Sequence, residues 1–375
     1  MRIHPKAAAW YKAILSATIL AAGLAACGGD DDDPAPAPPP VVTPPVVTSA
    51  YGTTALVADA APAAHVDPNL VNAWGIAFNP TGFVWVNNQG SNTSTLYDGT
   101  GVPQTLVVAI PPGSAGPARP TGIVFNASTD FKVTQNGVTG ASPFIFVGEA
   151  GTVSGWSPTV NRTNAITAVD TGGTSVYKGL AIASSGGANF IYATDFRNAR
   201  IDVYDASFQR ATLPAGAFVD PNLPSGYAPF GIQAAGNRIY VSYAQRNAGG
   251  TEEVKGAGLG VIDAYDTAGA FVARIATGGA LNAPWGMAVA PANFGDFSNS
   301  LLVANFGDGK INAYDAASGA FKGTLSRADR SPIVIDGLWG IAFGNGVQQQ
   351  PATSLFYTAG PGDETHGQYG KIELQ

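Results

Sequence analysis

Short segments in which bulky and small side chains alternate around a glycine recur along this chain. The first is Trp74-Gly75-Ile76-Ala77-Phe78. Five similar segments follow, each with glycine at its second position, and they begin at Thr121, Lys178, Phe230, Trp285 and Trp339. Their glycines are separated by 47, 57, 52, 55 and 54 residues. Repeats of about this length, built from short strands, are typical of propeller blades. The pattern therefore predicts an all-β fold, a six-bladed β-propeller.

The alternation within each repeat predicts a strand with one bulky face and one thin face. Such a strand suits a crowded position near the propeller axis, where the glycine lets a neighbouring backbone approach closely. The three tryptophans of the repeats, Trp74, Trp285 and Trp339, fit either of two roles. They form part of the core between blades, or they provide a platform on which a ligand stacks.

The final repeat holds one strand fewer than a four-stranded blade requires. Its strands are expected at Trp339–Phe343, Ser354–Thr358 and Gly370–Leu374, while Thr54–Ala58 reads as a strand with no neighbour before it. Propellers commonly complete one blade with strands from both termini, which removes two open sheet edges. We therefore expect the N-terminal strand to close the last blade.

The first 50 residues predict export and anchoring rather than folded structure. Residues 1–26 combine Arg2, Lys6 and Lys12 with a short apolar run, as a signal peptide does. The segment Leu24–Cys27 resembles the bacterial lipobox, which implies that Cys27 is lipidated and holds the protein at a membrane. Because Gly28 follows, this would be the outer membrane in a Gram-negative cell. Residues 27–50, rich in Asp and Pro, predict an extended linker, and residues 51–375 the propeller.

Composition narrows the possible chemistry. Charged residues make up 12% of the chain, and the net charge of −7 becomes about −10 once the leader is removed, which argues against a nucleic-acid partner. Cys27 is the single cysteine, so lipidation leaves no thiol for a disulfide, a nucleophile or a metal. No Gly-x-Ser-x-Gly motif, phosphate loop or dinucleotide fingerprint occurs.

Two family resemblances support the fold. Phe190–Asp205 resembles NHL-type repeats, and Tyr97-Asp98, Tyr265-Asp266 and Tyr314-Asp315 repeat its final aromatic-Asp pair. A closer resemblance is to a family of exported bacterial proteins of unknown activity, and it rests on the segments Asp67–Leu70, Asp220–Leu223, Asn282–Gly286, Asn305–Gly309, Asp336–Gly340 and Gly360–Gly367. Both imply an NHL-like six-bladed propeller, and neither implies a specific activity.

The ends of the predicted second strands should form a ring around one mouth of the axis. Asn88, Glu149, Asp195 and Asn305 stand at four of these ends, with Tyr243 and Ala359 at the other two. Oxygen-rich side chains of this kind suit Ca²⁺, and some six-bladed lactone hydrolases use a comparable ring. The alternative is that each side chain accepts hydrogen bonds from the backbone N–H groups of its own turn.

A second group of candidates lies where the ring should close. If Thr54–Ala58 completes the last blade, two loops meet on one face; they carry His65 and Asp67, and Asp363, Glu364 and His366. A histidine beside a carboxylate can act as a general base or bind a transition metal. The alternative is that these residues form hydrogen bonds in turns and at the seam.

The segment Glu252–Lys255 lies in the long loop 245–258. It is interpreted as a solvent-exposed loop segment, although such loops also contact partners.

The sequence thus predicts a lipid-anchored, monomeric envelope protein that binds a protein, glycan or small molecule on its loop-rich face. A metal-dependent hydrolase, with Ca²⁺ as cofactor, is the alternative. A purely structural or adhesive surface protein cannot be separated from the first of these, because a propeller fold does not determine its function.

Overall fold

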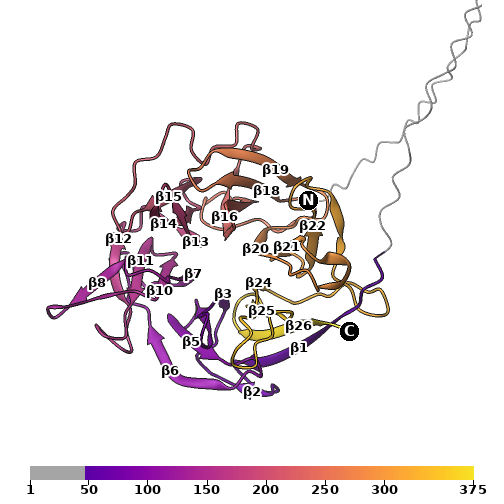
Figure 1. Cartoon of the computed structure of the whole chain (residues 1–375), viewed down its shortest axis with the longest axis horizontal. Helices are drawn as coiled ribbons and strands as arrows, with labels where there is room; N and C mark the ends of the chain where they lie inside the picture. Colours follow the sequence, from indigo (N-terminus) through magenta and orange to yellow (C-terminus); the bar gives the residue numbers. More distant parts are fainter. Residues whose placement is uncertain (1–46) are drawn as a thin grey trace, which may run out of the picture. The chain divides into compact units, whose positions relative to one another are not determined.

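The computed structural model describes residues 47–375. Within that range the chain forms six β-sheets arranged around a central axis (Figure 1). The predicted six-bladed propeller is confirmed. The predicted leader, Cys27 and most of the predicted linker lie outside the described residues. No helix in the described part is long and apolar enough to cross a membrane.

Each blade begins with one glycine-centred repeat as its inner strand: β3 (Ala73–Phe78), β7 (Pro120–Phe125), β13 (Tyr177–Ser185), β16 (Tyr227–Ala235), β20 (Pro284–Val289) and β24 (Leu338–Phe343). The second strands are β4 (Val84–Asn88), β10 (Phe144–Gly148), β14 (Ala188–Asp195), β17 (Arg238–Gln245), β21 (Leu301–Asn305) and β25 (Leu355–Ala359). The outer strands are β5 (Thr93–Tyr97), β6 (Pro103–Ala109), β11 (Thr152–Trp156), β12 (Ile166–Asp170), β15 (Arg200–Tyr204), β18 (Val261–Asp266), β19 (Phe271–Thr277), β22 (Ile311–Tyr314), β23 (Phe321–Thr324) and β26 (Gln368–Leu374). A small ribbon, β8 (Lys132–Gln135) and β9 (Val138–Ala141), is inserted in the second blade.

The N-terminal strand closes the last blade, as the sequence predicted. Strand β1 (Tyr51–Ala58) pairs antiparallel with β26, and the short β2 (His65–Val66) adds to its outer edge. Residues just before Tyr51, which the sequence predicted to be linker, also contact the propeller. For example, the backbone N–H of Ser49 donates to Asp296 Oδ2 over 2.8 Å.

Glycine in the inner strands permits contact between neighbouring backbones. A Cβ placed on Gly231 would lie 1.9 Å from the carbonyl oxygen of Trp285, the first residue of the next repeat. At the closure of the ring, a Cβ on Gly340 would lie 2.7 Å from the carbonyl oxygen of Trp74. Hydroxyl groups bridge the same junctions; for example, Thr194 Oγ1 donates to the carbonyl of Phe230 over 2.8 Å. The blades therefore meet backbone to backbone around the axis.

The third blade has three strands, whereas the repeat pattern predicted four. After β15 the chain makes a single bridge, between Tyr204 and Arg210. The Arg210 guanidinium pairs with Asp202 of β15, and Pro214 soon follows, which has no N–H to donate to a strand ladder. An ion pair and loop residues cover this edge instead.

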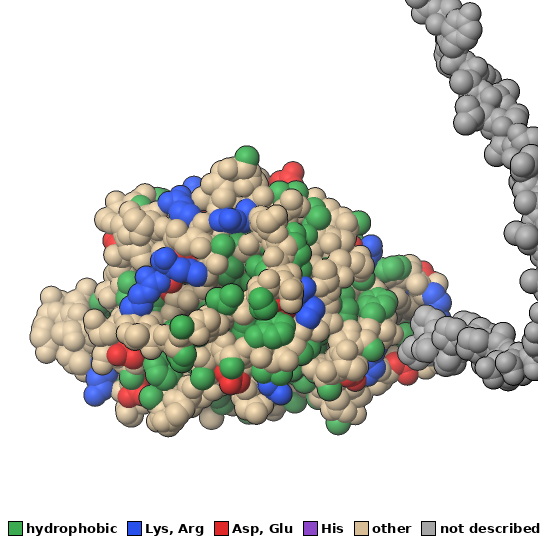
Figure 2. Space-filling model, turned by 90° about the horizontal axis from the view of Figure 1, so that it is seen from above, with side chains coloured by type: hydrophobic (Ala, Val, Ile, Leu, Met, Phe, Trp, Pro, Cys, Tyr) green, Lys and Arg blue, Asp and Glu red, His purple; other side chains and the backbone are tan. Residues whose placement is uncertain are grey.

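The outer surface reflects the low content of charged residues. On the face shown in Figure 2, Lys and Arg side chains lie in small groups separated by apolar and uncharged side chains. This face carries no broad basic surface of the kind that binds a nucleic-acid backbone.

Replacing Gly231 with Ala tests the close approach of the blades. We expect Gly231→Ala to lower the free energy of unfolding by about 1–3 kcal/mol, because the new methyl group overlaps the carbonyl of Trp285. Gly249→Ala is the control, since the nearest atom to its Cβ is 3.4 Å away. Equal stability of the two variants in urea unfolding would contradict the proposed contact.

Candidate functional site

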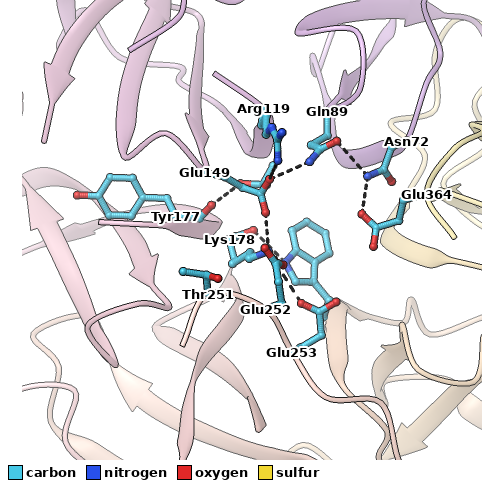
Figure 3. A network of polar contacts seen from close by, with 12 residues as sticks. Asn72, Gln89, Arg119, Glu149, Tyr177, Lys178, Thr251, Glu252, Glu253 and Glu364 are labelled. Atoms are coloured by element: carbon cyan, nitrogen blue, oxygen red, sulfur yellow. Dashed lines mark hydrogen bonds and ion pairs between the residues drawn. The ribbon is translucent and has the colours of Figure 1, made fainter. Parts of the chain in front are cut away.

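A fully buried lysine stands at the mouth of the propeller axis. Lys178 lies at the start of the third blade, and its side chain has no exposed surface. Its Nζ lies 2.5 Å from Glu149 Oε1, 2.8 Å from Glu252 Oε2 and 3.9 Å from Glu253 Oε2 (Figure 3). Glu149 follows β10, while Glu252 and Glu253 belong to the loop after β17. Three blades therefore supply one ion cluster.

Side-chain amides extend this cluster toward the closing seam. Gln89 Nε2 donates to Glu149 Oε2 over 2.8 Å. Asn72 Nδ2 donates to Gln89 Oε1 over 3.2 Å and to Glu364 Oε2 over 2.8 Å. The polar network in Figure 3 therefore reaches from the third blade through the first blade to the last one.

Aromatic rings form the floor beneath the ion cluster. The ring centroids of Trp74 and Trp339 are 3.7 Å apart, and those of Trp339 and Phe306 are 3.8 Å apart. Trp285 Nε1 donates to the carbonyl of Lys178 over 2.9 Å, and Lys178 Nζ lies 5.1 Å from the Trp74 ring centroid. All three tryptophans are buried. They serve as core between blades rather than as an open platform.

Lys178 remains charged despite its burial. Burial alone would lower the pKa of its ammonium group, but Glu149, Glu253 and Glu252 together raise it far above the ordinary value. Burial likewise acts to raise the pKa of Glu149, yet the charge and hydrogen bond of Lys178 leave it below its usual range. The two groups form a tightly coupled buried ion pair.

Glu253 behaves in the opposite way beside the same cation. Burial raises the pKa of its carboxyl group to about 7, and the charge of Lys178 offsets this only in part. The difference from Glu149 has a geometric cause. Glu253 Oε2 is 3.9 Å from Lys178 Nζ and has no hydrogen-bond partner within residues 47–375. A carboxylate that is buried without a hydrogen bond favours its neutral form.

These charges decide which chemistry Lys178 can perform. A lysine must lose its proton to act as a nucleophile or to form a Schiff base. With its pKa raised, the Lys178 amine stays protonated and acts as a fixed cation. The cluster is therefore suited to holding charged groups in place around the mouth.

A cavity of about 320 Å³ opens beside the cluster. Charged side chains of both signs line it, namely Arg119, Arg197, Glu149 and Glu252, together with Thr251 and small residues such as Gly116 and Gly173. A separate axial cavity of about 40 Å³ lies among the glycine-centred repeats. The axis opens again through a depression of about 240 Å³, whose lining side chains are apolar except for Gln233. Charged side chains thus line the cavity beside the cluster and are absent from the lining of this depression.

The four predicted calcium ligands do not share one set of contacts. Glu149 alone joins the Lys178 cluster. Asn88 Nδ2 donates to Thr93 and Thr95 of its own hairpin, each over 3.0 Å. Asp195 contacts Asn198 and Arg200 beyond its strand, and it also accepts from the N–H of Val176, just before β13. Asn305 donates to Asp308 in its own turn and to the carbonyl of Ala280, just before β20. Only Asp195 accepts backbone N–H bonds, from Val176 and Asn198. The buried amide oxygens of Asn88 and Asn305 have no hydrogen-bond partner among the described residues. The role of these four residues therefore stays a prediction. Among residues 47–375, no three His, Cys, Asp or Glu side chains form a group that could hold a metal ion.

The residues predicted at the seam are only partly brought together. His366 Nδ1 lies 2.8 Å from Asp59 Oδ2, across the junction of β1 and β26. Asp67 accepts from Asn69 within its own turn and from the Tyr97 hydroxyl, each over distances of 2.8 to 2.9 Å. The other three residues lie in different surroundings. His65 is in β2, and Asp363 is exposed, with its Oδ1 3.8 Å from Lys255 Nζ. Glu364 accepts a hydrogen bond from Asn72. Hydrogen bonds in turns and at the seam describe this arrangement.

Sequence reasoning missed the centre of the site. The segment Glu252–Lys255 was interpreted as a solvent-exposed loop segment, and this was wrong for Glu253, whose side chain is only 6% exposed. A signal for the site was present in the sequence. Lys178 occupies the first position of a repeat, where four of the other copies carry Trp or Phe. A charged residue at a position expected to be buried requires partners of opposite charge.

The position of Glu253 predicts a pH dependence of stability. Its pKa rises from the ordinary value of 4.5 to about 7 in the folded chain, so the folded state holds a proton that the unfolded state has released. Stability therefore falls as pH rises from 4.5 to about 7, by about 3 kcal/mol in total. Glu253→Gln removes this contribution, so its stability relative to the wild type should rise through that pH range. Parallel curves in urea unfolding would contradict this, and Asp363→Asn, at an exposed carboxylate, is the control.

Proteins with similar sequences are known, and those described below come from a virus. No protein-family model matches it. Uncharacterized protein R648 of Acanthamoeba polyphaga mimivirus is 33% identical over 318 residues, which cover 83% of this chain and 76% of that protein. Uncharacterized protein L690 of the same virus is 32% identical over 318 residues, covering 83% and 82%. These relatives are viral, so the bacterial, exported family expected from the motifs stays a prediction.

Solved structures with a similar fold include two enzymes. Virginiamycin B lyase from Staphylococcus aureus matches with a TM-score of 0.48 and 14% identity, covering 87% of this chain and 100% of the lyase. XC5397 from Xanthomonas campestris, a gluconolactonase, matches with a TM-score of 0.49 and 14% identity, covering 82% and 88%. Likeness at this level concerns the fold and carries no argument about activity. The identity and coverage of the viral relatives show that this chain belongs to the protein family that includes mimivirus proteins R648 and L690.

Proposed function

We propose that this protein is a lipid-anchored binding protein that captures a small polar ligand at the mouth of its propeller axis. The observation that carries the proposal is the cavity of about 320 Å³ lined by charged groups of both signs. Binding sites for small molecules are commonly concave, of about 300–1,000 Å³, with a few well-placed polar groups. The cavity meets both conditions.

The ion cluster supports this proposal because it holds one wall of the cavity in place. Glu149 lines the cavity and is bound by both Lys178 and Gln89. Glu252 lines it from the opposite side of Lys178, which ties the long loop to the third blade. A wall that is already ordered loses little conformational entropy when a ligand binds.

Catalysis is the less favoured function. Lys178 is held as an ammonium ion, and the predicted ligands Asn88, Asp195 and Asn305 each bond to a side chain of their own hairpin. The calcium-dependent hydrolase therefore remains the alternative, and the experiment below also addresses it.

Membrane attachment completes the proposal. The segment Leu24–Cys27 supports lipidation, and the Asp- and Pro-rich residues after it support a flexible linker. A double or triple acyl anchor at Cys27 would keep the propeller at the membrane surface stably. In a Gram-negative cell, Gly28 favours the outer membrane.

Filling the cavity tests the proposed binding function. A thermal-shift screen of small polar molecules should yield compounds that raise the melting temperature, as expected when a ligand binds only the folded state. Thr251→Trp places an indole in the cavity lining and should abolish the shift. Thr139→Trp, on the exposed strand β9, is the control and should leave it unchanged. A screen without any ligand, or equal shifts in both variants, would refute binding at this cavity. A large calcium-dependent shift that a chelator reverses would instead favour the hydrolase.

Replacing the lipidated cysteine tests the anchor. In a Gram-negative host that expresses the full chain, we expect the wild-type protein in the membrane fraction. Cys27→Ser, which removes the thiol that would carry the lipid, should move the protein to the soluble or uncleaved-precursor fraction. Recovery of both forms in the same fraction and with the same mass would refute lipidation.

A further inference from the structure

The cavity beside Lys178 offers more hydrogen-bond donors than acceptors. Within the described chain the guanidinium of Arg119 makes no hydrogen bond, and its closest charged contact is Glu149 Oε2 at 4.0 Å. Its side chain is 59% exposed. Arg197 uses a single Nη1 donor, bound to the carbonyl of Gly173 over 2.5 Å. Since an arginine carries five N–H donors, most of the donors in this lining remain open to a ligand.

The carboxylate acceptors in the same lining are already partly used by neighbouring donors. Glu149 Oε1 binds Lys178 and Glu149 Oε2 binds Gln89. Glu252 Oε2 also binds Lys178, which leaves its second oxygen. Because the unbonded donors of the two arginines outnumber the remaining carboxylate acceptors, the ligand that best complements this cavity brings mainly acceptor oxygens and a smaller number of donors.

We infer that the cavity binds the carboxylate of a small organic acid, with the guanidinium of Arg119 as its main contact and that of Arg197 as a second. The planar fork of arginine matches a carboxylate and binds it in a bidentate manner. A phosphate dianion fits less well, because Glu149 and Glu252 in the lining repel its greater charge. The inference rests on the proposed function and names the ligand class for the same cavity.

The backbone at Arg119 is fixed in a way that suits this role. Its N–H donates to Asn92 Oδ1 over 2.8 Å, and its carbonyl accepts from the N–H of Glu149 over 3.1 Å. Its φ of 47° lies in the left-handed region, which a non-glycine residue adopts only when its surroundings require it. The base of the side chain is thus held beside the cavity, while its charged end stays accessible.

The open oxygen of Glu252 adds a second feature of the ligand. It can accept a hydrogen bond from a hydroxyl or an ammonium group on the body of the acid. A hydroxy acid and a short peptide with a free carboxyl terminus both meet this description, and a cavity of about 320 Å³ is large enough for either.

Matched pairs of probes test the inference. Gluconate is compared with glucose, and the dipeptide Ala-Ala with its C-terminal amide, by calorimetry and thermal shift on the full propeller. We expect at least one carboxylate probe to bind about tenfold or more tightly than its neutral partner. Which pair responds distinguishes a hydroxy acid from a peptide terminus. Equal behaviour of the two members in both pairs would overturn the inference.

Substitution of Arg119 tests the assigned contact. Arg119→Met should weaken binding of the responding probe about tenfold or more, and Arg119→Lys should restore part of the loss, because charge returns without the fork. Arg162→Met is the control at an exposed arginine away from the cavity. Unchanged melting temperatures without ligand verify folding. Unchanged binding by Arg119→Met would overturn the assignment.

The outcomes separate the inference from the proposed function. If neither carboxylate binds but another polar compound does, and Thr251→Trp blocks that compound, the carboxylate inference fails and the binding function stands. If no compound binds in a way that Thr251→Trp blocks, both fail.

Discussion

The close approach of neighbouring inner strands at six glycines is the constraint on which this structure depends. Each repeat places its glycine against the backbone of the next repeat, and the contact of Gly340 with Trp74 completes the circle. The approach leaves little room near the axis, so the first residues of the repeats are forced into contact with one another. Their side chains, Trp74, Trp285 and Trp339 above all, become a packed floor instead of a channel lining.

Packing of the repeats near the axis also buries the charged side chain of Lys178, and this charge requires partners. The third repeat brings a lysine to a position where other repeats bring aromatic rings, and the ring closure removes it from water. An unpaired ammonium group at such depth would be very costly. The carboxylates of Glu149 in the neighbouring blade and Glu252 in the long loop after β17 neutralise it. The loop therefore folds inward across the mouth, and a cavity forms between it and the second and third blades.

A buried ion cluster of this kind is a weak source of stability, because apolar side chains of similar volume often stabilise a core equally well. Its structural effect is more specific. Lys178 joins segments that are 29 and 74 residues away in the chain, and it fixes their carboxylates relative to the arginines at the rim. The arrangement of charges at this mouth, rather than any single reactive group, supports a role in binding.

The sequence by itself determined the architecture, because the evidence for it is local and repeated. The spacing of the glycine-centred repeats indicated propeller blades, and their number indicated six. The missing strand of the last repeat identified Thr54–Ala58 as the closing strand. Some local contacts also agree with the sequence: Asn88, Asp195 and Asn305 each bond to a side chain of their own hairpin, although Asn88 and Asn305 donate rather than accept. Only the tertiary structure decided where the functional candidates meet. Lys178, Glu149 and Glu253 lie in different repeats, and neither spacing nor composition shows that a polar loop turns inward. The loop turns inward because the buried charge of Lys178 needs partners, and Lys178 is buried only once the ring of blades has closed around it.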